Sequence, residues 1–165
     1  RVAELALGMM LALARRIPEA DASMKAGKWD KKNLEGTQLK DKTLGVIGFG
    51  RIGRQLATYA QAFGMTVLAY DVIAPKPMAG VQIVSLDEII TKADYISLHV
   101  PLTPETKNII GEKTLPKMKK NVRIVNCARG GTLDEAAVLK AVEAGRSPAP
   151  RSTSSPRSRP RTSAS

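Results

Sequence analysis

From residue 43 onward, short apolar runs alternate with amphipathic segments. The apolar runs are nearly continuous, which is typical of parallel strands that are buried on both faces of a sheet. Strands are expected in TLGVIG, TVLAYD, YISLHV and VRIVNCA, and helices in RIGRQLATYAQAFG, SLDEIITKAD and TLDEAAVLKAVEAG. Repeated strand–helix–strand units favour right-handed crossovers. We therefore predict an α/β fold with a doubly wound parallel sheet.

Local boundary signals support this division of the chain. Ser85 with Glu88 and Thr132 with Glu135 have the spacing of capping boxes, in which the two residues bond to each other's backbone at a helix start. Two glycines stand where helices should end, Gly64 and Gly145.

Residues 1–28 are expected to form two further helices, over 2–15 and 18–26. Pro18 suits a first helical turn, and Gly27 suits a helix stop. Apolar side chains surround most of the first helix, so we expect it to be buried on several sides, partly by a second copy of the chain.

The composition is that of one globular domain. Of the 165 residues, 43% are apolar and 25% are charged. The single thiol, Cys127, excludes an internal disulfide framework and favours a reducing compartment, the cytoplasm. The N-terminal apolar run carries Glu4 and is too short to span a bilayer, so no membrane segment is expected. Because the sequence starts at Arg1, we interpret it as part of a longer chain.

The net charge of +11 suggests a nucleic-acid partner, but its distribution argues against one. Five arginines and no acidic residue lie in the last twenty positions, so residues 1–145 hold 21 basic against 15 acidic residues, or +6. This excess is mild. The alternative, a basic tail that binds nucleic acid, predicts binding that weakens steeply with salt.

The stretch VIGFGRIGRQ places three glycines between a predicted strand and a predicted helix. Gly48 allows a tight turn, Gly50 lets the backbone approach a pyrophosphate, and Gly53 lets the helix pack close to the sheet. The helix N-terminus offers free N–H groups to the phosphates. Asp71, 18 residues after Gly53, would accept hydrogen bonds from the ribose hydroxyls and repel a 2′-phosphate. We predict a Rossmann-type domain that binds NAD rather than NADP; the plainer alternative is a set of turn glycines beside a surface aspartate.

Several stretches together resemble the cofactor domain of the D-isomer-specific 2-hydroxyacid dehydrogenases. They are AELALGMMLALARRIPEADASMKAGKWDKK, LGVIGFGRIGRQ, ADYISLHVPLTPETKNII and VNCARGGTLDEAAVLKAVEAG. The resemblance implies hydride transfer between NAD and a small 2-hydroxyacid, and a homodimer formed through the first helix. SMKAGKW and VNCARGG are similar to the branch that oxidises 3-phosphoglycerate to 3-phosphohydroxypyruvate in serine biosynthesis. The alternatives are a glyoxylate, hydroxypyruvate or other 2-hydroxyacid reductase and, from another class, an NAD-sensing corepressor.

The resemblance also assigns residues to the site. It implies cofactor contacts for Arg51, Ile52, Val100, Pro101, Cys127, Ala128 and Arg129. Arg129 is the one catalytic assignment, because it matches the arginine whose planar fork of donors holds the substrate carboxylate. A cation at a helix start is the alternative for Arg129. No metal site is expected.

His99 is the only histidine, but the family's proton-transfer histidine belongs to a later motif, where it pairs with a glutamate. We therefore interpret His99 as a cofactor-lining or structural residue. We likewise interpret Cys127 as a wall residue rather than a nucleophile. A chain without the proton-transfer pair should show little or no turnover.

The composition changes after Gly145 to RSPAPRSTSSPRSRPRTSAS, which cannot bury a core, so disorder is predicted for residues 146–165. The folded domain should then cover residues 1–145. Family members continue here into a strand similar to AGAALDVFEEEPP. If GC-rich codons are assigned and one base is restored after the codon for Arg146, the tail reads AGAALDVFAEEPP. We interpret the tail as a one-base frameshift, which resequencing of the locus would test.

Overall fold

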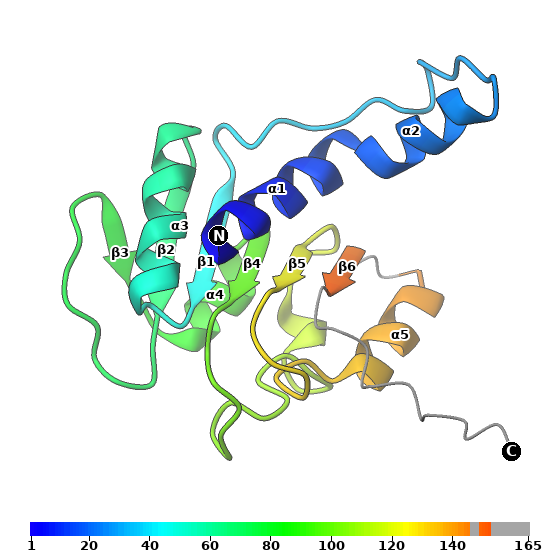
Figure 1. Cartoon of the computed structure of the whole chain (residues 1–165). Coiled ribbons are helices and arrows are strands. Elements are labelled where there is room, and N and C mark those ends of the chain that lie inside the picture. The colour runs from blue at the N-terminus through cyan, green and yellow to red at the C-terminus, as the bar shows by residue number, and fades with distance from the viewer. Residues whose placement is uncertain (146–148, 153–165) are drawn as a thin grey trace, which may run out of the picture.

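The chain folds around a parallel sheet with helices on both faces (Figure 1). The computed structural model describes residues 1–145 and 149–152. The strands are β1 (Thr43–Ile47), β2 (Thr66–Tyr70), β3 (Val81–Ile83), β4 (Tyr95–Leu98), β5 (Arg123–Asn126) and β6 (Ala149–Ser152). The helices are α1 (Val2–Arg15), α2 (Ile17–Lys25), α3 (Arg51–Ala62), α4 (Leu86–Lys92) and α5 (Glu135–Glu143), with a 3-10 turn η1 (Leu115–Lys117). All strands run parallel in the order β3-β2-β1-β4-β5-β6, which confirms the predicted doubly wound fold.

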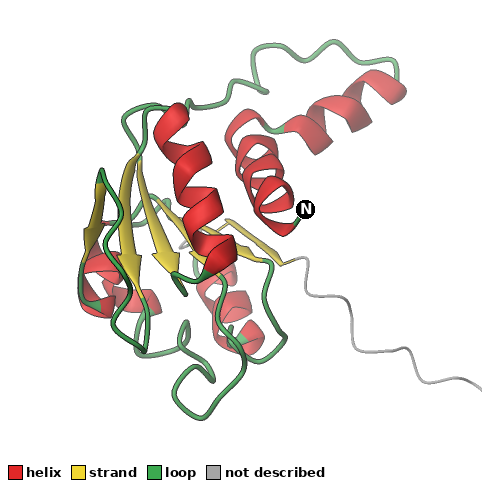
Figure 2. Cartoon of the chain, turned by 60° about the vertical axis from the view of Figure 1, so that its left-hand side comes forward, coloured by secondary structure: helices red, strands yellow, loops and turns green. Residues whose placement is uncertain are grey.

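Two apolar cores lie on opposite faces of the sheet. Helices α1 and α3 cover one face, and α4 and α5 cover the other (Figure 2). Because side chains alternate along a strand, Leu44 and Val46 of β1 join the first core, whereas Ile96 and Leu98 of β4 join the second. Burial on both faces explains why these strands are continuously apolar in the sequence.

The two N-terminal helices differ in burial. Helix α1 buries five residues against α3 and the sheet, Ala3, Ala6, Met9, Met10 and Ala14. Helix α2 buries none and extends away from the sheet (Figures 1 and 2). The predicted first helix is confirmed residue for residue, and the second begins and ends one residue earlier than predicted. Among the described residues, no helix combines the length and apolarity that a membrane crossing requires.

One predicted capping box is confirmed and the other is wrong. The Ser85 hydroxyl accepts the N–H of Glu88 at 3.2 Å, and the Glu88 carboxylate accepts the N–H of Ser85 at 3.2 Å. Helix α5 instead begins two residues later than expected, with Asp134 as its cap accepting the N–H of Ala137 at 3.0 Å. Thr132 is fully buried and its hydroxyl is used in the preceding loop, so it is not available as a cap.

The sequence did not predict the two edge strands. Strand β3 is three residues long and largely exposed, so its apolar pattern is weak. Disorder was predicted for residues 149–152, but they pair with β5 as β6. Backbone hydrogen bonds need no apolar side chains, and an edge strand tolerates a proline such as Pro150. The disorder predicted for 146–148 and 153–165, and the frameshift interpretation, concern residues outside those described.

Candidate functional site

The predicted site residues meet at one edge of the sheet. They follow the carboxyl ends of β1, β2, β4 and β5, which are neighbours in the sheet. The chain order reverses between β1 and β4, because β2 and β3 lie on one side and β5 and β6 on the other. Ligands of open α/β sheets bind at such a reversal, outside the carboxyl ends of the strands.

The three glycines of the β1–α3 loop meet different surroundings. Gly48 has φ +95°, and a Cβ there would lie 2.6 Å from the carbonyl carbon of His99. A Cβ on Gly53 would lie 2.2 Å from the carbonyl oxygen of Gly48. A Cβ on Gly50 would meet nothing within 4 Å. Gly48 and Gly53 are therefore required by the fold itself, whereas Gly50 faces open space where a ligand can approach.

The N-terminus of α3 is open to an anion. Gly50 is its N-cap and supplies no side-chain cap, and the first turn contains no acidic residue. Arg51 and Ile52 of this turn are exposed. Uncapped N–H groups and the positive end of the helix dipole together favour a phosphate at this position.

Asp71 lies beside this loop, directly after β2. Its Oδ2 accepts the backbone N–H of Phe49 at 2.7 Å, so one carboxylate oxygen fixes the glycine loop. The other carboxylate oxygen, Oδ1, can accept hydrogen bonds from the hydroxyls of a ribose. The next two residues, Val72 and Ile73, are 49% and 81% exposed and offer apolar surface for a flat base. Pyrophosphate, ribose and base thus each find a suitable group, so the described residues fit NAD.

His99 has a structural part in the loop after β4. Burial lowers the pKa of His99 to about 4, so the imidazole is neutral at physiological pH. Its Nε2 is hydrogen-bonded to the Ser97 hydroxyl at 2.8 Å, and within the described residues its buried Nδ1 has no hydrogen-bond partner. Its backbone N–H donates to the Ile47 carbonyl at 2.7 Å and its carbonyl group faces Gly48. This geometry supports a structural residue rather than a proton carrier.

Arg129 lies on the loop after β5, and this loop is held by buried polar groups. The Thr132 hydroxyl donates to the Arg129 carbonyl at 2.9 Å and accepts from Nδ2 of Asn126 at 3.2 Å. Oδ1 of Asn126 accepts the N–H of Ala128 at 3.0 Å. The Arg129 side chain is exposed and has no hydrogen bond or ion pair with a described residue. The loop is therefore fixed while its guanidinium is available for a ligand.

The loops after β4 and β5 are tied to each other. The N–H of Asn108 donates to the Gly131 carbonyl at 2.9 Å, and the N–H of Asp134 donates to the Ile110 carbonyl at 2.9 Å. Within the β4 loop, the buried Thr106 hydroxyl donates to the Pro101 carbonyl at 2.5 Å. The first two bonds hold the two loops together, and the third fixes the β4 loop internally.

The remaining predicted contacts differ in exposure. Pro101 is exposed, whereas Val100 is buried and packs by its Cγ1 near Gly48. Cys127 and Ala128 are half-buried, and Sγ of Cys127 lies 3.8 Å from Sδ of Met9 in α1. Pro101 can therefore contact a ligand directly, whereas the side chain of Val100 packs beneath the glycine loop.

Sequence reasoning missed the groups that position the site. Asn126 was not expected to have a role, and Thr132 was expected only as a helix cap, although each is a polar residue in or next to an apolar run, which is a signal of a buried hydrogen bond. The link from Asp71 to Phe49 and the tie between Asn108 and Gly131 join segments that are distant in sequence, so no local pattern announces them.

The fold and the site together define a dinucleotide-binding domain. Residues 7–149 match the family described as D-isomer specific 2-hydroxyacid dehydrogenase, NAD binding domain. The chain therefore belongs to this family, and NAD is the cofactor of its domain.

Individual relatives agree with this family. The chain is 53% identical to D-3-phosphoglycerate dehydrogenase of Methanocaldococcus jannaschii over 88% of this chain and 28% of that protein. It is 52% identical to hydroxypyruvate reductase of Thermotoga maritima, over 88% of this chain and 47% of that protein. D-lactate dehydrogenase from Aquifex aeolicus, solved with NAD and lactic acid, superposes with a TM-score of 0.87 at 37% identity over 93% of this chain and 47% of that one. The chain thus spans between about a quarter and half the length of these relatives.

Proposed function

We propose that this chain is the cofactor-binding part of an NAD-dependent dehydrogenase that oxidises a D-2-hydroxyacid, with 3-phosphoglycerate as the favoured substrate and 3-phosphohydroxypyruvate as the product. The observation that carries the proposal is the β1–α3 loop, where Gly50 faces open space at a helix N-terminus without a side-chain cap and the carboxylate of Asp71 bonds to the neighbouring Phe49. The 53% identity to a D-3-phosphoglycerate dehydrogenase favours this substrate, and with it a cytoplasmic role in serine biosynthesis.

Arg129 would hold the substrate carboxylate, so that the hydrogen on C2 faces the nicotinamide ring. A guanidinium suits this task because its parallel N–H groups match the two carboxylate oxygens. Hydride transfer also requires a base for the hydroxyl proton of the substrate. His99 does not suit that role, because burial lowers its pKa to about 4, which makes it a weak base, and its Nε2 is already hydrogen-bonded to the Ser97 hydroxyl. We therefore expect the chain by itself to bind NAD without appreciable turnover, measured as NADH formation at 340 nm.

Calorimetric titration tests the cofactor assignment. We expect saturable binding of NAD that is stronger than binding of NADP, because Asp71 repels a 2′-phosphate. Asp71→Ala should weaken NAD binding roughly tenfold to a hundredfold, the usual effect of losing a hydrogen bond to a charged group. Asp71→Asn is the matched variant, since its amide oxygen still accepts the N–H of Phe49 while the charge is lost. NAD binding that is equal in all three proteins would refute the role of Asp71.

The relationship to hydroxypyruvate reductase favours a second substrate within the same class. The whole parent enzyme should be assayed for kcat/KM with 3-phosphoglycerate and NAD, and with hydroxypyruvate and NADH. A kcat/KM for hydroxypyruvate that exceeds that for 3-phosphoglycerate in the same enzyme would replace the favoured substrate without changing the cofactor site.

We also propose that two copies associate through the N-terminal helices. Helix α2 buries no residue, yet Ile17, Met24 and the following Trp29 are 51%, 55% and 79% exposed. Such a group of large apolar side chains is typical of an interaction surface. Sedimentation should show a dimer that a Met24→Ala/Trp29→Ala variant loses and that Leu139→Ala, an exposed change on α5, keeps. A chain that sediments as a monomer at micromolar concentration would contradict this association.

A further inference from the structure

A second pocket lies at the opposite, amino-terminal edge of the sheet. It is bounded by the junction of α1 and α2, by the residue before β1, and by the first residues of β4 and β5. Its volume of about 540 Å³ is within the range of roughly 300–1,000 Å³ typical of small-molecule sites. Strands β1, β4 and β5 run from this edge to the glycine loop and the Arg129 loop, so a ligand here does not touch the NAD site.

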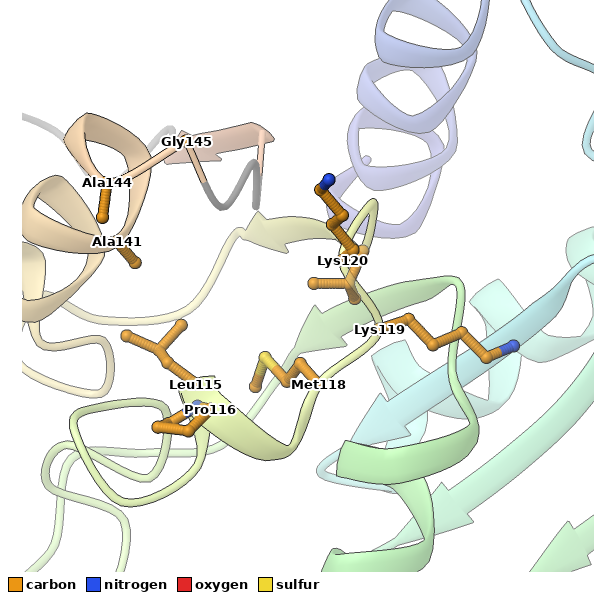
Figure 3. A pocket seen from close by; sticks show the side chains of 9 residues that line it. Leu115, Pro116, Met118, Lys119, Lys120, Ala141, Ala144 and Gly145 are labelled. Carbon is orange, nitrogen blue, oxygen red and sulfur yellow. The ribbon is translucent and has the colours of Figure 1, made fainter.

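The lining of this pocket is strongly basic. Five cationic side chains, Arg16, Lys42, Lys119, Lys120 and Arg123, face two carboxylates, Glu19 and Asp94. A neighbouring apolar hollow of about 420 Å³, lined by Leu115 and Met118, shares Lys119 and Lys120 with it. Figure 3 shows both lysines leading away from that apolar lining, with Lys120 directed toward α1. Their charges therefore belong to the basic pocket.

Asp94 is already occupied by partners within the protein. Its Oδ2 accepts the N–H of Thr43 at 2.8 Å, and its Oδ1 accepts from Nζ of Lys119 at 2.8 Å. Burial alone would raise the pKa of Asp94, but the bonds from Lys119 and Thr43, together with the charge of Lys42, outweigh it and lower the pKa. Asp94 and Lys119 thus offset each other, and the remaining four cations still outnumber the one further carboxylate, Glu19, so the lining keeps a positive excess.

Arg123 is held in a fixed position by one side of its guanidinium. Its Nη1 donates to the Thr37 hydroxyl at 2.9 Å and to the Tyr95 hydroxyl at 2.5 Å, and the group lies 5.3 Å from the centre of the Tyr95 ring. In the described part of the chain, Nε and Nη2 have no hydrogen-bond partner, and Lys42 and Lys120 form no ion pair. The pocket thus contains one pre-positioned guanidinium edge and two lysines without ion-pair partners.

We propose that this pocket binds a small phosphate-bearing anion at a site separate from the NAD site. A phosphate offers several oxygens, which can accept two N–H groups of the Arg123 fork and one from each lysine. The excess of cationic over anionic side chains in the lining makes the potential in the pocket positive, which favours such an anion. The pocket volume suits a small metabolite rather than a duplex or a folded partner.

Calorimetric titration of the 165-residue chain with inorganic pyrophosphate at low ionic strength tests the site. A Lys42→Gln/Lys120→Gln variant should bind pyrophosphate at least about tenfold more weakly, since each lysine supplies a charge-assisted hydrogen bond. The matched control is Lys32→Gln/Lys113→Gln, which removes the same charge from exposed positions outside the pocket. NAD affinity is measured in every variant and should not change.

Three results would overturn the proposal. One is an absence of saturable pyrophosphate binding, and another is equal affinity in the pocket variant and the control variant. The third is binding that NAD displaces and that Arg51→Gln abolishes, because the ion would then occupy the glycine loop. NAD binding without pyrophosphate binding would leave the proposed function intact, so the two proposals fail separately.

Discussion

Replacing a glycine of the β1–α3 loop by alanine should lower stability at Gly48 and Gly53 but lower NAD affinity at Gly50. At Gly48 the added Cβ meets the backbone of His99 at 2.6 Å, and φ is +95°. A strained backbone costs about 1–3 kcal/mol and an overpacked contact about the same, so we expect a loss of roughly 2–6 kcal/mol in the free energy of unfolding. At Gly53 the clash at 2.2 Å with a backbone oxygen acts without the strain in φ, so roughly 1–3 kcal/mol is expected.

Gly50→Ala should leave folding intact. Its φ of −78° and ψ of −158° suit any residue, and no atom lies within 4 Å of the new Cβ. Alanine can even stabilise the fold by about 0.4–1 kcal/mol, because the unfolded chain loses conformational freedom. The same Cβ would occupy the space of the pyrophosphate and weaken NAD binding roughly tenfold to a hundredfold.

Thermal denaturation and NAD calorimetry on the three variants separate these effects. A stability change of 1 kcal/mol corresponds to roughly 2–4 °C in Tm for a chain of this size, so the expected losses are easily measured. The reasoning is refuted if Gly50→Ala unfolds the protein or binds NAD like the parent, or if Gly53→Ala is as stable as the parent.

Further predictions concern pH, the Arg129 loop and one helix cap. Because burial lowers the pKa of His99 from 6.5 to about 4, stability should be complete above pH 6.5 and fall toward pH 4 by up to about 3 kcal/mol; urea midpoints should show this slope, and His99→Gln should remove it. Thr132→Val should cost about 1–3 kcal/mol in unfolding free energy by leaving buried groups unpaired, whereas Thr132→Ser keeps the hydroxyl; equal denaturation midpoints would contradict this. Ser85→Ala should cost about 0.5–2 kcal/mol in the same assay through the lost cap of α4, while Ser85→Asp keeps most of it.

Much of the fold could be predicted because it depends on local patterns. The strands β1, β2, β4 and β5 are continuous apolar runs, and α4 has a capping box that the structure confirms. The predictions that were wrong concern residues whose hydrogen bonds are made with segments outside their own local pattern. Thr132 has the spacing of a cap, but its hydroxyl bonds to Asn126 and to the Arg129 carbonyl instead. Residues 149–152 have no strand-like composition, yet they pair because the edge of β5 offers unpaired backbone groups.

The sequence by itself determined the doubly wound sheet, the glycine loop and the carboxylate of Asp71. Each of these depends on residue types at fixed short spacings, and backbone geometry converts such spacings directly into turns, helix starts and strand ends. Only the tertiary structure decided that Gly50 alone among the three glycines faces open space, that the half-buried His99 bonds to Ser97, and that basic residues distant in sequence meet at the other edge of the sheet. Those facts arise where separate segments pack together, and packing depends on the whole chain rather than on any one stretch of it.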